Sequence, residues 1–258
     1  MFHVEQFRLP QLCNTIPTAG HQQKNPAEPA SADTDSSASA AIAHYPSSEA
    51  VQTFEQYYAL LTRWNSTYNL TSISDPEDFT QLHILDSLAA LELIPHGAHI
   101  CDIGAGAGFP GLPLRIARPD ISLDLIESRG KKIQFLKECA HALNLENVRP
   151  FHSRMEDFKP ASKYERIVSR ATFSNDNWIF SVQHWLSQNG AILLWRSLEP
   201  QKTGFSDASK SASNREPAPH ADFFQKLNWS VRRHYYKIST LAYRVIEEWR
   251  PLETRATE

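Results

Sequence analysis

Cysteine is scarce in this sequence, and the scarcity limits the redox and metal chemistry open to it. Only Cys13, Cys101 and Cys139 are present, an odd number without a C-x-x-C spacing. Neither a disulfide framework nor a cysteine-based zinc site fits this pattern, so we expect a reduced, cytoplasmic protein without a metal. Apolar runs of the roughly 20 residues that span a bilayer are also missing. Residues 1–12 lack the basic start and apolar centre of a secretory signal, so we expect no membrane association.

The sequence also has no excess of basic over acidic residues. The formal net charge of −3 disfavours a nucleic-acid partner at first sight. Residues 1–50, however, hold two basic and five acidic residues, and the other 208 residues balance 24 against 24. The overall charge is therefore uninformative, and the positions of the cations must decide the question.

Two segments contain few residues that could form a core. Residues 15–46 and 199–221 are rich in Ala, Ser and Pro, a composition that cannot offset the entropy of ordering. We therefore predict a disordered tail over residues 1–47 and a flexible insertion at 199–221. The remaining chain divides into a helical region, residues 48–95, and an α/β domain, residues 96–258.

The helical region shows two clear signals. An apolar stripe recurs at helical spacing, formed by Val51, Phe54, Tyr58, Leu61 and Trp64. The triplet Asp75-Pro76-Glu77 combines a capping acid, a proline in the first turn and a further acid, which predicts the start of a second helix. Two packed helices are therefore expected ahead of the α/β domain.

From residue 99 onward, strand and helix patterns alternate. Strands are predicted at 99–104, 121–127, 147–152, 164–171 and 190–196, helices at 110–118, 129–143 and 175–186, and a closing hairpin at 229–238 and 241–249. This alternation predicts an α/β fold with a doubly wound, mostly parallel sheet. Ligands of such sheets bind at the carboxyl ends of the strands, near the point where the strand order reverses.

The stretch CDIGAGAGFPG, residues 101–111, lies at that edge, directly after the first strand. The dinucleotide motif G-x-G-x-x-G fails because Phe109 stands at its third glycine, and the phosphate-binding loop fails for want of Lys and Ser or Thr. Asp102 suits a cationic ligand, and Glu127 at the end of the next strand suits the two hydroxyls of a ribose. S-adenosylmethionine satisfies both requirements. The alternative is a plain tight turn with Glu127 as a solvated strand end.

Six cations follow the predicted strands at the same edge: Arg129, Lys131, Lys132, Arg154, Arg170 and Arg196. Such a cluster beside a methyl-donor site points to a polyanionic substrate such as RNA. For Arg129, Lys131 and Lys132, solvation of a helix start is an equally good explanation. Glu156 and Asp157 either accept the adenine amino group or are surface carboxylates at a helix start.

Five blocks of the chain occur in the order of one known family. They are WNSTYNLTSISDPEDFTQLHILDSL, CDIGAGAGFPGLPLRIARPD, LIESRGKKIQFLKE, LNLENVRPFHSRMEDF and YERIVSRA, between Trp64 and Ala171. This region resembles the bacterial 16S ribosomal RNA guanine-N7 methyltransferases, the RsmG or GidB family. The W-N-x-x-Y-N-L-T and H-I-L-D-S blocks are more specific than the glycine loop.

The resemblance implies a class I S-adenosylmethionine-dependent methyltransferase fold with an N-terminal helical cap. It further implies a monomer acting on 16S ribosomal RNA or a small-subunit assembly particle. The expected donor-binding residues are Asp102, Gly104, Gly106, Gly108, Phe109, Glu127, Met155, Glu156 and Arg170. Arg170 and Arg154 would position donor and substrate. The expected RNA contacts are Arg129, Lys131, Lys132, Arg196 and His83, and Asp86 would lie near the site in the cap. For His83 the alternative is a histidine packed inside the helical region.

The expected chemistry needs no general base, because guanine N7 carries an in-plane lone pair and no proton. Catalysis would then come from alignment and electrostatics.

Several positions depart from the family pattern, namely Ala105, Ala107, Leu82 and the pair Arg196-Ser197. Two alternatives therefore stay open: a methyltransferase for another RNA or a small molecule, and a non-catalytic RNA-binding or assembly factor.

Overall fold

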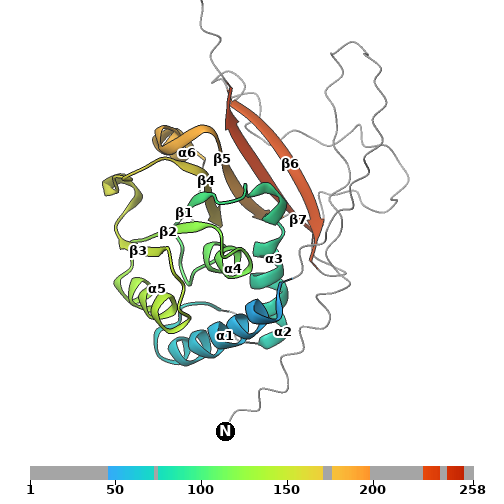
Figure 1. Ribbon diagram of the computed structural model, residues 1–258, viewed down its shortest axis with the longest axis vertical. Coiled ribbons are helices and arrows are strands. Elements are labelled where there is room, and N and C mark those ends of the chain that lie inside the picture. The colour runs from blue at the N-terminus through green and yellow to red at the C-terminus, as the bar shows by residue number, and fades with distance from the viewer. Residues whose placement is uncertain (1–45, 73–74, 171–175, 198–228, 239–242, 253–258) are drawn as a thin grey trace, which may run out of the picture.

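The apolar segments that predict strands pair into one seven-stranded sheet (Figure 1). The protein is represented by a computed structural model, which describes residues 46–72, 75–170, 176–197, 229–238 and 243–252. The strands are β1 (His99–Ile103), β2 (Ser122–Glu127), β3 (Val148–His152), β4 (Tyr164–Arg170), β5 (Leu186–Ser197), β6 (Trp229–Lys237) and β7 (Tyr243–Pro251). Their spatial order is β3-β2-β1-β4-β5-β7-β6. The first five are parallel, and β7 runs antiparallel to both neighbours, which confirms the mostly parallel sheet and the closing hairpin.

Strand β1 lies at the point where the strand order reverses. It pairs with β2 on one side and β4 on the other, so that Asp102 has Leu125 and Val168 as its register partners. The loop that leaves β1 therefore opens at the position where doubly wound sheets bind their ligands.

Helices cover both faces of the sheet, as the doubly wound class predicts. The α-helices are α1 (Ser48–Tyr68), α2 (Pro76–Asp78), α3 (Asp86–Leu88), α4 (Gly111–Ala117), α5 (Gly130–Ala142) and α6 (Trp178–Val182). On β1, Ile100 joins the apolar core that contains α1, α4 and α5, whereas Cys101 joins a second core with Trp178 of α6. Successive residues of a strand point to opposite faces of the sheet, so these two cores lie on its two faces, each between the sheet and a layer of helices.

Helix α1 buries a face slightly rotated from the predicted stripe. Ser47 caps it by accepting a hydrogen bond from the Ala50 N–H at 3.1 Å. The residues buried on it are Ala50, Phe54, Tyr57 and Leu61, whereas Val51, Tyr58 and Trp64 are half-buried. The predicted stripe is therefore fully buried at Phe54 and Leu61 and only partly buried at Val51, Tyr58 and Trp64, and Tyr57, which the stripe did not include, is fully buried. A period of 3.6 residues places both Tyr57 and Tyr58 near the stripe, and packing against the sheet selects Tyr57.

The second helix begins where Asp75 predicts it, but it changes its winding. Asp75 Oδ1 accepts the N–H groups of Glu77 and Asp78 at 2.8 and 3.2 Å. After one α-helical turn the chain becomes a π-helix over Phe79–Leu85, and it returns to α-helix in α3. The Asp86 N–H accordingly reaches the Gln81 carbonyl five residues back. This wider turn leaves both His83 and Asp86 buried.

Smaller differences concern the boundaries of elements. The helix expected at 175–186 is split into α6 and a 3₁₀ turn at Gln183–Trp185, and β5 starts at Leu186 rather than at 190. The predicted tail up to residue 45 and the predicted insertion at 199–221 lie outside the described residues. Within the described part of the chain, no helix has both the length and the apolarity that crossing a membrane requires.

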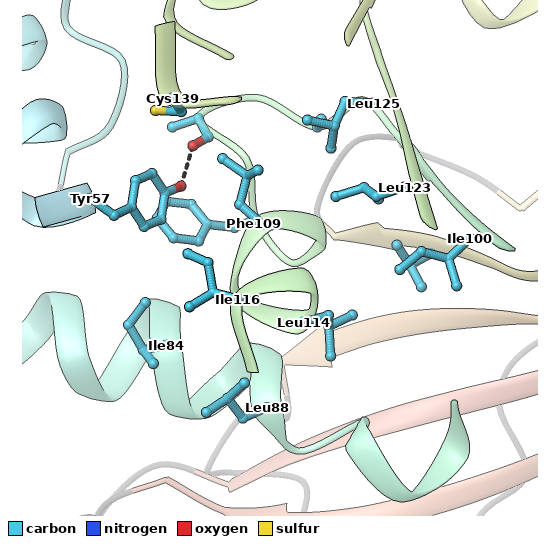
Figure 2. Close-up of a cluster of buried hydrophobic side chains, with 14 of the residues drawn as sticks. Tyr57, Ile84, Leu88, Ile100, Phe109, Leu114, Ile116, Leu123, Leu125 and Cys139 are labelled. Atoms are coloured by element: carbon cyan, nitrogen blue, oxygen red, sulfur yellow. Dashed lines mark hydrogen bonds between the residues drawn. The ribbon is translucent and has the colours of Figure 1, made fainter. Parts of the chain in front are cut away.

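The cap and the glycine loop share one core (Figure 2). Tyr57 of α1 is fully buried, and its hydroxyl donates a hydrogen bond to the Ala107 carbonyl in the loop. The Tyr57 ring lies 5.5 Å from the Phe109 ring and 5.9 Å from the Phe79 ring, between centroids. The glycine loop is therefore packed against helix α1 of the cap through Ala107 and Phe109.

Substitution of Gly108 by alanine should destabilise the protein strongly. Gly108 has φ +102°, and an added Cβ would lie 2.5 Å from Leu112 Cδ1 and 2.8 Å from Tyr57 Oη. We expect the free energy of unfolding to fall by about 2–5 kcal/mol in denaturant titrations. Gly97→Ala is the matched control, because Gly97 has φ +66° and no atom within 4 Å of the added Cβ. It should cost about 1–2 kcal/mol, and equal losses in both variants would show that the contacts around Gly108 do not matter.

Candidate functional site

The loop after β1 is held by backbone bonds to the end of β2. The N–H groups of Gly104 and Ala105 donate to the Ile126 carbonyl at 2.9 and 3.1 Å. Gly106 has φ +60°, and an added Cβ there would meet nothing closer than Lys132 Nζ at 3.6 Å. Gly106 therefore presents open backbone at the sheet edge, whereas Gly108 and Gly111 are explained by tight packing inside the protein.

Glu127 ties this loop to β2 and remains able to accept further hydrogen bonds. Its carboxylate is 6% exposed at the strand end. Oε2 accepts the Gly106 N–H at 2.9 Å, and Oε1 accepts the Arg129 N–H at 2.8 Å. An ionised carboxylate has about four acceptor positions, of which these bonds use two. The remaining positions suit the two hydroxyls of a ribose, as the sequence suggests.

Asp102, in strand β1 just before the loop, has a fully buried carboxyl group. Its Oδ2 accepts the Gly111 N–H at 2.8 Å, whereas Oδ1 has no hydrogen-bond partner among the described residues. Burial raises the pKa of Asp102 to about 7, although the Gly111 N–H and the Arg170 charge both act to lower it. A buried carboxyl oxygen without a partner is unfavourable alone and is stabilised by a cation or a donor group at the site.

The residues expected beside an adenine follow β3. The Ser153 N–H donates to the Glu127 carbonyl at 3.2 Å, which joins the end of β3 to the end of β2. Met155 is buried in a short 3₁₀ turn, and Arg154 and Glu156 on either side of it are exposed. The structure therefore brings these residues to the strand end that carries Glu127.

The six cations of the edge divide into two groups. Arg196 forms ion pairs with Asp176 and with Glu247, the second at 3.3 Å, and Arg170 pairs with Asp86 at 2.9 Å. The other four make no ion pair with a described carboxylate, and they are mainly exposed: Arg129, Lys131, Lys132 and Arg154. We call these four the basic patch. Within the described ranges, no group of three His, Cys, Asp or Glu side chains could hold a metal ion.

Arg170 at the end of β4 joins the sheet to the cap. One guanidinium nitrogen, Nη1, donates to Asp86 Oδ2 and to the Leu82 carbonyl, both at 2.9 Å, and Nη2 bonds to His83 Nδ1 at 2.8 Å. The guanidinium carbon also lies 5.1 Å from the centroid of the Phe109 ring. The predicted positioning residue is therefore itself held from several sides.

The bond to Arg170 fixes the protonation of His83. Because arginine only donates, His83 Nδ1 must be the acceptor, and the proton of the neutral ring lies on Nε2. That Nε2 lies 3.1 Å from Thr71 Oγ1, and the ring stacks on Phe109 at 4.0 Å between centroids. Burial and the Arg170 charge lower the pKa of His83 to about 3. His83 is 8% exposed, so a direct RNA contact has little surface available, whereas the alternative of a packed histidine fits this burial.

Sequence reasoning missed three partners of Asp86, one of which is Arg244, whose Nε lies 3.9 Å from Asp86 Oδ1. The other two donate hydrogen bonds. The Tyr236 hydroxyl donates to Asp86 Oδ1 at 2.6 Å, and the Trp195 indole N–H donates to the Asp86 carbonyl at 2.7 Å. Both come from strands far along the chain, so no local pattern could have revealed them. Another missed residue is Thr71, a half-buried partner of His83 that lies inside the W-N-x-x-Y-N-L-T block.

Comparison with known proteins agrees with this geometry. The family model described as GidB, rRNA small subunit methyltransferase G, matches residues 50–217. A ribosomal RNA small subunit methyltransferase G of Legionella pneumophila is 43% identical over 143 residues, which cover 55% of this chain and 67% of the relative. One of Idiomarina loihiensis is 39% identical over 142 residues, covering 55% and 68%. The solved structure of a DhpI–SAH complex aligns with a TM-score of 0.50 at 12% identity over 80% of this chain and 98% of the other, a likeness of fold alone.

Removal of the Asp86 carboxylate should be costly. The Arg170 side chain is only 15% exposed, and Asp86→Ala removes the carboxylate with which it forms an ion pair. Loss of one partner of a buried pair typically costs about 3–5 kcal/mol of the free energy of unfolding. The control is Glu138→Ala, which removes an ion pair to Arg63 between side chains 41% and 66% exposed. It should cost at most about 1 kcal/mol, and similar denaturation midpoints for the two variants would contradict this interpretation.

His83 should stay neutral down to about pH 3. Between about pH 6.5 and pH 3 the unfolded chain binds a proton at this residue that the folded chain does not. Stability contributed by the neutral ring is therefore present above pH 6.5 and is lost as pH falls, by about 1.4 kcal/mol per pH unit. The NMR signals of the His83 ring should not titrate near pH 6.5, and the slope of stability with pH should be shallower in His83→Gln.

Proposed function

Because this chain belongs to the GidB family of rRNA small subunit methyltransferases, we propose that it transfers a methyl group from S-adenosylmethionine to guanine N7 of 16S ribosomal RNA. The observation that carries the proposal is the sheet edge formed by Gly106, Glu127 and Asp102 at the reversal of strand order. The seven-stranded sheet to which this edge belongs has the architecture of class I S-adenosylmethionine-dependent methyltransferases. The proposal includes action as a monomer in the cytoplasm on this RNA or a small-subunit assembly particle.

The residues at this edge fit the methyl donor. Glu127 has acceptor positions left for a ribose, Asp102 has a buried oxygen that lacks a partner, and Gly106 leaves room for close approach. The donor supplies an electrophilic methyl group carried on a sulfonium cation. A negative charge on Asp102 favours that cation, whereas the absence of phosphate removes any need for a Lys or hydroxyl in the loop.

The chain would contribute alignment and electrostatics to the reaction. Guanine N7 offers its lone pair without losing a proton, so no residue needs to act as a general base. We assign Arg170 and Arg154 to the positioning of the reacting groups, since they follow β4 and β3 at this edge. His83, being neutral and buried against Arg170, would orient that arginine rather than contact RNA. Orientation of this kind contributes to catalysis without changing protonation.

The basic patch is the proposed contact with RNA phosphates. Its four cations lack ion pairs to described carboxylates, so their charge is available to a polyanion. Arg196 was predicted to share this role, but Asp176 and Glu247 compensate its charge. We therefore give Arg196 a structural role at the end of β5.

The decisive experiment is methyl transfer to defined substrates. The purified protein, labelled S-adenosylmethionine and 16S RNA or small-subunit particles should yield label as 7-methylguanosine, located by mass spectrometry. Label entering only another RNA or a small molecule would replace the proposed substrate. Failure to bind the donor in calorimetry would favour a non-catalytic RNA-binding or assembly factor.

The proposed role of Arg170 predicts that a substitution there slows RNA methylation without weakening the binding of S-adenosylmethionine. Arg170→Lys keeps the charge but loses the planar fork that reaches Asp86 and His83. We expect the rate of RNA methylation at saturating substrates to fall about 100-fold, with the dissociation constant of the donor nearly unchanged.

Arg196→Lys is the control for this prediction, because Arg196 is also ion-paired at a strand end. Its methylation rate should stay close to that of the unmodified protein. Equal losses of donor affinity and methylation in Arg170→Lys would refute the division of roles.

A further inference from the structure

An exposed aromatic ring lies beside the basic patch. Tyr68, the last residue of α1, is 41% exposed. Among the described residues only two other large hydrophobic side chains are exposed, Tyr235 and Leu252, and both belong to the hairpin end of the sheet. Single exposed apolar residues are common on protein surfaces, so Tyr68 needs a second observation before it indicates a site.

Lys131 supplies that observation. Its Nζ lies over the face of the Tyr68 ring, 5.1 Å from the ring centroid, and Lys131 is exposed in the first turn of α5. The next residue, Lys132, has its Nζ 3.6 Å from the position of a Cβ on Gly106. The ring, the two lysines and the open backbone of the donor loop therefore follow one another along a single stretch of surface.

The Tyr68 ring is held in place by its neighbours. The Trp64 ring lies 5.3 Å from Tyr68 and 5.7 Å from Phe135 of α5, between centroids. Helix α1 ends directly after Tyr68, where Asn69 adopts φ +49° and donates to the Asn65 carbonyl at 3.2 Å. A ring fixed in this way loses little conformational entropy when a ligand stacks on it.

We propose that Tyr68 and Lys131 form a stacking site for an unpaired base of the RNA substrate, next to the base that is methylated. The base takes the place of the Lys131 ammonium group over the Tyr68 ring, and the flexible lysine side chain turns aside to pair with the phosphate of that nucleotide. This inference rests on the proposed function, because it places the site on the same substrate. RNA suits the surface better than a protein partner does, since the exposed ring is bordered by cations rather than by further apolar side chains.

The test compares Tyr68→Ala with Tyr235→Ala, a tyrosine of nearly equal exposure, 42%, on the edge strand β6. With saturating donor and an RNA that the unmodified protein methylates, Tyr68→Ala should raise KM for RNA about 5- to 100-fold. The value of kcat and the dissociation constant of S-adenosylmethionine should stay within about twofold. Tyr68→Phe and Tyr68→Trp should keep the KM of the unmodified protein, and Tyr235→Ala should not change it.

A second comparison tests the phosphate contact. Lys131→Ala should reduce the slope of log affinity against log salt concentration by about 1. Lys137→Ala, which removes an exposed lysine from the same helix further from Tyr68, should leave that slope unchanged.

Several results would overturn the stacking site. An unchanged KM for RNA in Tyr68→Ala would do so, as would a parallel loss of donor affinity or a failure of Tyr68→Phe to keep the original KM. If Tyr68→Ala does not fold, Tyr68→Leu decides, because it keeps apolar packing on Trp64 but removes the aromatic face. A failure of the proposed function is distinguishable, because the unmodified protein would then not methylate the RNA at all.

Discussion

The ion pair between Arg170 and Asp86 is the contact on which the candidate site depends. Two charges removed from water cost more than their attraction returns unless further hydrogen bonds satisfy them. Here Asp86 also accepts the Tyr236 hydroxyl, and Arg170 also donates to Leu82 and His83. The pair therefore fixes the cap, the end of β4 and the C-terminal hairpin relative to one another. A ligand at the sheet edge would therefore meet a surface in which the cap, the end of β4 and the hairpin are already connected by hydrogen bonds.

The side of the candidate site proposed for the donor is organised by hydrogen bonds between backbone N–H groups and buried carboxyl groups. Glu127 and Asp102 accept N–H groups from the loop and from the start of α4, so the carboxyl groups and the backbone fix each other. The Tyr57 hydroxyl fixes the far side of the loop from the cap. A loop held at both sides can present open backbone at Gly106 without collapsing into the space beside it.

Local chemistry could be predicted from the sequence wherever it depends on neighbouring residues. The capping acid Asp75, the glycine loop and the alternation of strands and helices all appear where their patterns indicate. The predicted stripe included Tyr58 but not the fully buried Tyr57, because a helix period cannot separate adjacent residues when the packing partner is unknown. The π-helical winding at Phe79–Leu85 was not predicted, because the apolar pattern of this segment indicates a helix without specifying its winding. Tyr236 lies 150 residues from Asp86, beyond the reach of any local rule.

The contact between Tyr236 and Asp86 also sets an order of events during synthesis. A ribosome adds about 5–20 residues per second, so Asp86 is synthesised roughly 8–30 s before its hydroxyl partner Tyr236. Over that interval the nascent chain can form the parallel strands and the glycine loop, but the Asp86 carboxylate lacks one of its donors. The candidate site at the sheet edge is therefore completed only after the hairpin has been translated. A nascent chain of this protein would become competent late, as one of the last steps of its own biogenesis.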